Sequence, residues 1–144
     1  MSTQRGFSLI EISLTSALIA LILVLALPFG INAFRNYLMI FETRNIVTIL
    51  RHAQTFAITN TYEGRYGVAF LADQMVLFRG DTYNTRNQSF DEIYPRSTAV
   101  TVSAPSEIVF ESLSGNPNAI SSIIISNGQN NLEININGHG VIDW

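Results

Sequence analysis

The stretch that decides the fold is Arg5-Gly6-Phe7-Ser8-Leu9-Ile10-Glu11, which is followed at once by an apolar run from Ile12 to Ala33. The run holds twenty-two residues without a charged side chain. At ~1.5 Å rise per residue, a helix of that length crosses a hydrocarbon core of ~30 Å. We therefore expect residues 7–33 to form a helix that is able to span a bilayer, with one small domain after it.

Glu11 places a carboxylate at the mouth of this apolar run. A charged side chain in a membrane is costly unless it finds a partner, so an acid at this position predicts a function. We expect the partner to be an amine. Gly6 has no side chain, so an extended backbone could enter a protease cleft there. Arg5 is the only charged side chain in residues 1–6 and favours leaving them on the cytoplasmic side.

The string closely resembles the signature of type IV prepilins, in which a short basic leader ends in glycine and a glutamate follows four residues beyond the new terminus. The resemblance implies that prepilin peptidase removes residues 1–6, cutting between Gly6 and Phe7, and methylates the exposed amine of Phe7. It also implies that Glu11 pairs with that amine on a neighbouring subunit. Pilins similarly carry a proline about twenty-one residues after the cleavage site, and Pro28 stands at that distance from Phe7.

A proline removes one helical hydrogen bond and crowds the preceding turn, so we expect a kink near Pro28 rather than the end of the helix. Residues 34–60 continue as an amphipathic helix. Its apolar stripe, at three- and four-residue spacing, comprises Ile46, Ile49, Leu50, Ala53, Phe56 and Ala57. Its predicted polar face comprises Glu42, Arg44, Arg51 and Gln54. The stripe should pack against the residues that follow.

Residues 61–144 change to a two-residue period, which is typical of strands. The predicted strands are Arg65–Ala72, Gln74–Arg79, Thr98–Ser103, Glu107–Ser112, Ile120–Ser126, Leu132–Asn137 and Gly140–Asp143. Gly80–Gln88 is polar and is expected to form a loop. Short strands at this spacing predict a small antiparallel sandwich or meander against the helix stripe. The expected fold is therefore α+β and pilin-like: a long N-terminal helix packed on a β-rich head.

Composition argues against an enzyme. The chain has no cysteine, and its two histidines, His52 and His139, have no metal-ligand spacing around them. No Gly-x-Ser-x-Gly string occurs. We expect His52 to be a polar-face residue and His139 a turn residue, with no cofactor, metal or catalytic group. The eleven acids outnumber the eight basic residues, all arginines, which makes nucleic acid an unexpected partner.

Three further patterns have ordinary interpretations. Some major pseudopilins bind calcium, and Asp73, Asp81, Asp91 and Glu92 could supply oxygen ligands for such an ion. The spacing of these acids matches no EF-hand, so we expect them to be solvated. Arg44 and Arg51 share a helix face, where we expect them to be solvated or paired with acids of a neighbouring subunit. Asn87-Gln88-Ser89 fits a glycosylation triplet, which is a weak signal.

Among pilins and pseudopilins, the chain looks most like the minor pseudopilins of the H type, the GspH/FimT-like group. The resemblance rests on residues 50–57 (LRHAQTFA), on an early hairpin and on the closing stretch 136–142 (INGHGVI). Two departures matter. Major pilins commonly close a C-terminal loop with a disulfide, which a chain without cysteine lacks. Some FimT-like minor pilins bind DNA through a basic C-terminal region, whereas this chain ends Val-Ile-Asp-Trp.

The sequence thus predicts a structural subunit of a type II secretion pseudopilus or a type IV pilus. It would be made as a single-pass inner-membrane protein with its head in the periplasm and then enter the filament, with prepilin peptidase and other subunits as partners. One alternative is a DNA-binding minor pilin for DNA uptake. A second is a periplasmic domain with an ordinary signal peptide, cut after Val24-Leu25-Ala26. A plain single-span anchor would leave Gly6-Phe7 and Glu11 unexplained.

Overall fold

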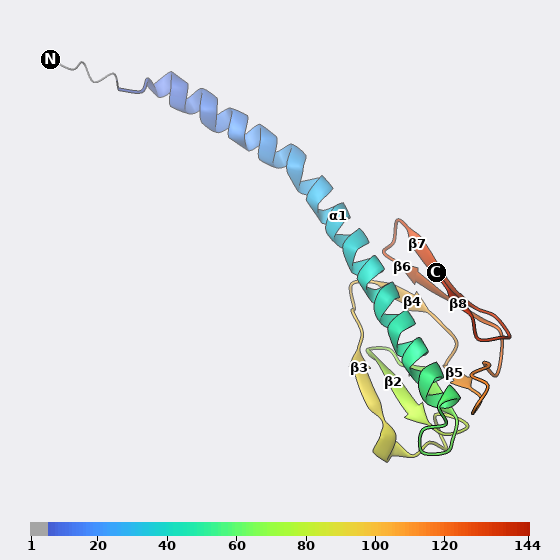
Figure 1. The fold of residues 1–144 in the computed structure, drawn as a ribbon. Helices are drawn as coiled ribbons and strands as arrows, with labels where there is room; N and C mark the ends of the chain where they lie inside the picture. Colours follow the sequence, from blue (N-terminus) through green and yellow to red (C-terminus); the bar gives the residue numbers. More distant parts are fainter. Residues whose placement is uncertain (1–5) are drawn as a thin grey trace. The chain divides into compact units, whose positions relative to one another are not determined.

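The long N-terminal helix predicted from the sequence is present. The computed structural model describes residues 6–144, apart from the side chains of residues 26–29. The chain forms two compact units, of which the first ends at Phe34 and the second, called the head below, is Arg35–Trp144. Helix α1 (Leu9–Ile58) runs through the first unit into the head (Figure 1).

Helix α1 ends two residues before the predicted boundary at 60 because the chain turns into a left-handed conformation there. Asn60 has a φ of 49°, and its N–H donates to the carbonyl of Ala57 at 3.1 Å. The N–H of Thr61 reaches back to the carbonyl of Phe56, also at 3.1 Å. These two bonds form the Schellman motif, and asparagine is one of the few residues that adopt its left-handed position at modest cost.

The head contains two four-stranded antiparallel sheets. The first has the order β3-β2-β1-β5, with bounds β1 (Tyr66–Phe70), β2 (Gln74–Arg79), β3 (Glu92–Pro95) and β5 (Glu107–Phe110). The second has the order β4-β6-β7-β8, with bounds β4 (Thr101–Ser103), β6 (Ser121–Ser126), β7 (Asn131–Ile136) and β8 (Ile142–Asp143). The chain passes between the two sheets three times, at residues 96–100, 104–106 and 111–120. The α+β class with one long helix on small antiparallel sheets is therefore confirmed.

The predicted strands differ from the observed ones mainly at their ends. Strand β2 has the predicted bounds, and it pairs with β1 in the expected early hairpin. Strand β3 was not predicted, because Glu92-Ile93-Tyr94-Pro95 shows no clear alternation and ends in proline, which is unfavourable inside a sheet. It is an edge strand, paired only with β2, and an edge position tolerates that proline.

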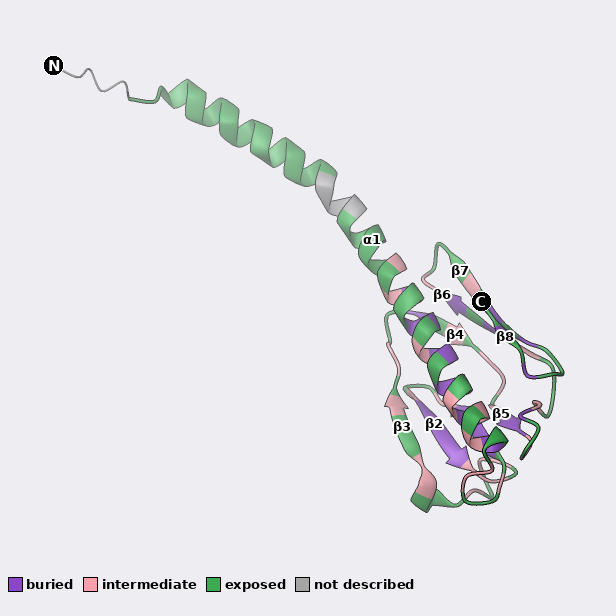
Figure 2. Ribbon diagram, viewed as in Figure 1, coloured by how far each residue is buried: buried purple, intermediate pink, exposed green. Residues whose placement is uncertain are grey.

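The core lies between α1 and the two sheets, as the purple segments of Figure 2 show. The predicted stripe is buried, since Ile46, Leu50, Ala53 and Ala57 are fully inaccessible and Ile49 is nearly so, whereas Phe56 is only partly buried. Both sheets contribute large apolar side chains to the same cluster: Val68, Met75, Leu77, Ile108 and Phe110 from the first, and Ile123, Ile125, Ile134, Ile136 and Ile142 from the second. One helix stripe thus holds two sheets together.

Gln54, predicted on the polar face, is instead half-buried and connects α1 to two loops. Its Nε2 donates to the carbonyl of Gly115 at 3.1 Å and to that of Gly140 at 2.7 Å. Both glycines have left-handed φ values, 67° and 77°. A Cβ would collide with Ile58 at position 115 and with Gln54 itself at position 140. Only glycine therefore allows the loops before β6 and β8 to approach the helix this closely.

Candidate functional sites

The first turn of α1 places Glu11 at the positive end of the helix. The carbonyl of Ser8 accepts hydrogen bonds from the N–H of Glu11 at 3.0 Å and of Ile12 at 3.2 Å, so Ser8 is the N-cap. Ser8 and Glu11 have the spacing of a capping box. The helix dipole stabilises a negative charge in the first turn by about 0.3–1 kcal/mol. This local effect offsets only part of the cost of placing a carboxylate in a membrane.

The stem, which we define as Leu9–Phe34, exposes its apolar side chains all round. Leu14, Leu18 and Leu21 are 66%, 55% and 60% exposed, and the described side chains around them are similar. The hydroxyls of Ser13, Thr15 and Ser16 donate to backbone carbonyls one turn earlier, so they need no outside partner. Glu11 is the only charged residue of the stem. No described residue forms a hydrogen bond or ion pair with its carboxylate.

Among the described residues, α1 is the one helix that is long and apolar enough to cross a membrane. None of its apolar window is buried within the protein. Length and composition therefore support membrane anchoring through the stem. The orientation of the helix across the membrane stays a prediction.

Gly6 and Phe7 precede the helix and are exposed, whereas Arg5 and the rest of the predicted leader lie outside the described residues. A Cβ added at Gly6 would have no atom within 4 Å. No described contact within the chain therefore requires glycine at this position, and a requirement would have to come from another molecule. The predicted kink at Pro28 falls on residues 26–29, whose side chains are outside the description, although α1 continues through them.

The predicted arginine pair lies on the outer face of α1. Arg44 and Arg51 are both exposed. Arg44 lies 5.8 Å from the ring centre of Trp144, and Arg51 donates from Nη2 to the carbonyl of Ile142 at 3.4 Å. Among the described residues, neither arginine has a carboxylate at ion-pair distance. Both therefore contact the C-terminal end of the chain rather than an acid of the head.

The two histidines lie in different parts of the head. His52 is half-buried on α1, with its ring 4.3 Å from that of Phe56 and its Nδ1 3.9 Å from Glu92 Oε2. His139 is exposed in the turn before β8, where its N–H donates to Asn137 Oδ1 at 2.9 Å. The predicted turn position of His139 is confirmed. His52 differs from a fully solvated polar-face residue because it packs on an aromatic ring.

The four acids considered as calcium ligands are not brought together. Asp81 lies 3.3 Å from Arg65, and both carboxylate oxygens of Asp91 accept from Arg86 Nε at 3.0 and 2.8 Å. Glu92 accepts from the hydroxyl of Tyr94 at 2.5 Å. Asp73 is exposed in the turn between β1 and β2. Within the described part of the chain, no three His, Cys, Asp or Glu side chains are placed to hold one metal ion.

Glu42 was predicted on the polar face of the helix, and this prediction is wrong: its side chain is 1% exposed. Its Oε1 lies 3.9 Å from Nε of Arg96, whose side chain is 9% exposed, and neither of these two buried atoms has a hydrogen-bond partner. Burial raises the pKa of Glu42, while a hydrogen bond from the Ser97 backbone and the charge of Arg96 oppose that shift. Arg96 also donates to the carbonyl of Leu71 at 2.7 Å. The pair therefore links the segment between β3 and β4 to α1.

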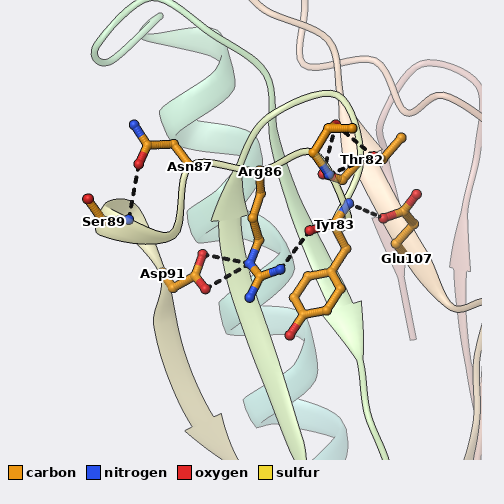
Figure 3. Close-up of polar contacts among 8 residues, drawn as sticks. Thr82, Tyr83, Arg86, Asn87, Ser89, Asp91 and Glu107 are labelled. Atoms are coloured by element: carbon orange, nitrogen blue, oxygen red, sulfur yellow. Dashed lines mark hydrogen bonds and ion pairs between the residues drawn. The ribbon is translucent and has the colours of Figure 1, made fainter.

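The loop predicted over Gly80–Gln88 is present, and its order comes from contacts that the sequence did not reveal (Figure 3). The guanidinium of Arg86 stacks 3.7 Å from the ring centre of Tyr83, donates to the Tyr83 carbonyl at 2.7 Å and pairs with Asp91. Glu107 accepts from the backbone N–H of Tyr83 at 2.6 Å. The Tyr83 ring in turn covers a second small core of Ala69, Phe78 and Val109. The first sheet is therefore covered on both faces.

Asn87, the first residue of the glycosylation triplet, uses its side chain within this loop. Its Oδ1 accepts from the N–H of Ser89 at 3.1 Å and caps the short helix η1 (Gln88–Phe90). The side chain is exposed at the surface. Its local role as a cap is a sufficient reason for asparagine at this position.

Comparison with protein-family models, curated proteins and solved structures finds no match to this chain.

Proposed function

We propose that this chain is a minor pilin or pseudopilin, a non-enzymatic subunit of a filament. It is made as a precursor with the leader 1–6 and is anchored in the inner membrane by residues 7–33. From the membrane it is drawn into a type II secretion pseudopilus or a type IV pilus. Its partners are prepilin peptidase and the neighbouring subunits. The stretch 50–57 and the closing stretch 136–142 favour the H type, the GspH/FimT-like group.

The observation that carries the proposal is a single carboxylate in the first turn of an otherwise uncharged, exposed apolar helix. Glu11 follows Phe7 by four residues, and no described group of the chain neutralises it. A secretory signal peptide has an apolar residue where this chain has Glu11. A simple membrane anchor needs neither the acid nor the glycine before Phe7.

The proposed role of Glu11 follows from its cost. A charged acid costs about 2.5–3.5 kcal/mol at the middle of the membrane on insertion scales, and less near the interface. The amine of Phe7 on the next subunit would offset this cost, because an ion pair forms only when the two stems lie side by side with a fixed axial shift. Contacts between different surfaces of identical or similar subunits do not close on themselves and therefore build open helical filaments.

Mass spectrometry of the protein extracted from membranes tests the first step. We expect a chain that begins with N-methylphenylalanine at position 7. Gly6→Leu should block this processing because the extended backbone at the cleavage site would carry a bulky side chain. Gly30→Ala is the matched control, since a Cβ at position 30 also meets no atom within 4 Å, and it should be processed normally. A mature chain that begins at Leu27, or one that retains residues 1–6, would contradict the proposal.

A further inference from the structure

A pocket of about 390 Å³ lies in the head, where the end of α1, the turn after it, η1 and the start of β3 meet. Its lining residues are Phe56, Thr61, Tyr62, Tyr66, Ser89, Phe90, Asp91 and Glu92. This volume falls in the range of ordinary ligand sites, although at its low end. We call it the aromatic pocket. It lies outside the stem and has no part in the role proposed for Glu11.

Aromatic rings from four separate segments form the walls. Phe56 and Tyr66 are tilted against each other with ring centres 5.3 Å apart, and Tyr62 and Phe90 are 5.1 Å apart. The hydroxyl of Tyr66 donates to the carbonyl of Thr61 at 2.8 Å, so its ring rather than its hydroxyl serves the pocket. The faces of aromatic rings carry partial negative charge and attract cations.

The charged groups of the lining are both acids, Asp91 and Glu92. Arg86 donates to both carboxylate oxygens of Asp91, so the charge of Asp91 is already neutralised within the chain. Glu92 receives only the Tyr94 hydroxyl and lies 3.9 Å from His52. Both of these contacts are made by Oε2, so Oε1 of Glu92 is the carboxylate oxygen of the lining that no described residue engages. The lining contains no arginine. Two basic groups lie just outside the lining: His52, beside Glu92, and Arg79, whose guanidinium already lies over the Phe90 ring at 4.8 Å from its centre.

The rim of the pocket is held in an unfavourable backbone conformation. Tyr62 and Glu63 have φ values of 55° and 53°, in the left-handed region that residues with a side chain rarely adopt. Arg79 stabilises this turn by donating to the carbonyls of Tyr62 and Glu63. Tyr62 is 67% exposed beside the pocket. Strain of this kind concentrates at binding sites, where it fixes the geometry before a ligand arrives.

We propose that the aromatic pocket binds the cationic end of an arginine or lysine side chain presented by a partner polypeptide. The exposed ring of Tyr62 receives the cation, and Glu92 supplies the ion pair. Both Tyr62 and Glu92 remain substantially exposed, and contacts of this kind are weak at exposed positions. The pocket is therefore suited to one anchoring side chain within a larger interface and not to tight retention of a free small cation.

The test uses the full-length chain in detergent micelles, with tyrosine and phenylalanine labelled with ¹³C for NMR. Three probes are titrated: a blocked peptide Gly-Gly-Arg-Gly-Gly, the same peptide with the neutral isostere citrulline, and guanidinium chloride. We expect ring resonances of the pocket to shift with the arginine peptide. The citrulline peptide should bind more weakly by about tenfold or more because it lacks the charge. Guanidinium ion alone should also bind more weakly than the arginine peptide.

Matched variants locate the binding. Glu92→Gln should weaken binding of the arginine peptide, whereas Glu133→Gln removes the same charge from an exposed position on β7 and should not. Tyr62→Leu should weaken it, whereas Tyr37→Leu removes a comparably exposed ring, 63%, from α1 and should not. Equal binding of the two peptides, or wild-type affinity in both Glu92→Gln and Tyr62→Leu, would overturn the proposal. Equal affinity for guanidinium ion and for the arginine peptide would contradict the proposal that the ligand is a side chain of a polypeptide.

Discussion

Two leucines of α1 illustrate how differently one helix is used in its two parts. Leu14 in the stem is 66% exposed, whereas Leu50 in the head is fully buried. In the head, the polar and apolar residues separate onto different faces, and the sheets cover the apolar one. In the stem, the described apolar residues are exposed, as the green colour of that part of the helix in Figure 2 shows.

The difference indicates that the apolar residues of the stem and of the head pack against different partners. A stripe three or four residues apart matches a surface within the same chain. A helix that is apolar all round matches a surrounding that is apolar on every side, such as a bilayer or a bundle of like stems. Substitutions in the head should therefore change the stability of the isolated chain, and substitutions in the stem should change its association. The following predictions test this division, from the largest expected effect on the head to the smallest.

Leu50→Ala should have the largest effect on the head. Leu50 is inaccessible between α1 and both sheets, so its removal leaves a cavity and should lower the free energy of unfolding by about 2–5 kcal/mol. The measurement is urea unfolding of the detergent-solubilised chain, followed by the fluorescence of Trp144. Leu14→Ala is the control and should leave the midpoint unchanged. Equal shifts in the two variants would remove the distinction between the parts of α1.

Gln54→Ala should have the next largest effect. The substitution deletes both hydrogen bonds from Nε2 to the carbonyls of Gly115 and Gly140, at a cost of about 1–3 kcal/mol. Thr48→Ala changes an exposed residue of the same helix, whose hydroxyl bonds only to the Arg44 carbonyl one turn earlier, and should cost much less. The same unfolding experiment compares the two. A Gln54→Ala midpoint as high as that of Thr48→Ala would mean that the two loops are held without this side chain.

Glu42→Gln should change the pH dependence of stability. Because burial raises the pKa of Glu42, the folded chain holds a proton that the unfolded chain has released at the same pH. The group therefore stabilises the fold most below its ordinary pKa, and this contribution is lost as pH rises through the raised pKa. Glutamine does not titrate, so the variant should gain stability relative to wild type as pH rises above 4.5, the ordinary pKa of the carboxyl group, and the gain should stop growing once pH has passed the raised pKa.

Urea midpoints of wild type and Glu42→Gln, measured at a series of pH values from below 4.5 upwards, provide the measurement. Glu133→Gln is the control, because Glu133 is exposed and its loss should leave the pH profile nearly parallel to that of wild type. Parallel profiles for Glu42→Gln would show that Arg96 and Ser97 compensate the burial of the carboxylate in full.

These sites also mark the limit of what the sequence could predict. Local periodicity was enough for the helix stripe and for β2, because the signal lies within a few neighbouring residues. Glu42 was misplaced because charged residues are almost never fully buried unless paired, and its partner Arg96 is far away in the sequence. The role of Gln54 depends on two glycines in distant loops. The aromatic pocket joins residues of four segments, and no single stretch of sequence contains its pattern.

Glu11→Val should have no effect on the stability of the head, since Glu11 contacts no described side chain there. Insertion into the membrane and removal of residues 1–6 should also continue, because neither step needs the carboxylate and valine suits the membrane better. What should fall is incorporation beside other subunits, since the amine of Phe7 on a neighbour would lose its counter-charge.

Cysteine crosslinking between introduced stem positions of this subunit and its neighbours measures that incorporation, with processing scored on the same gel. Ser13→Val is a suitable control, because the Ser13 hydroxyl bonds only to the carbonyl of Leu9 within the same helix. It should crosslink as wild type does. If Glu11→Val also crosslinks as well as wild type, the carboxylate does not set the register between stems. The acid would then be explained by the first turn of the helix alone, where a negative charge is favoured in any case.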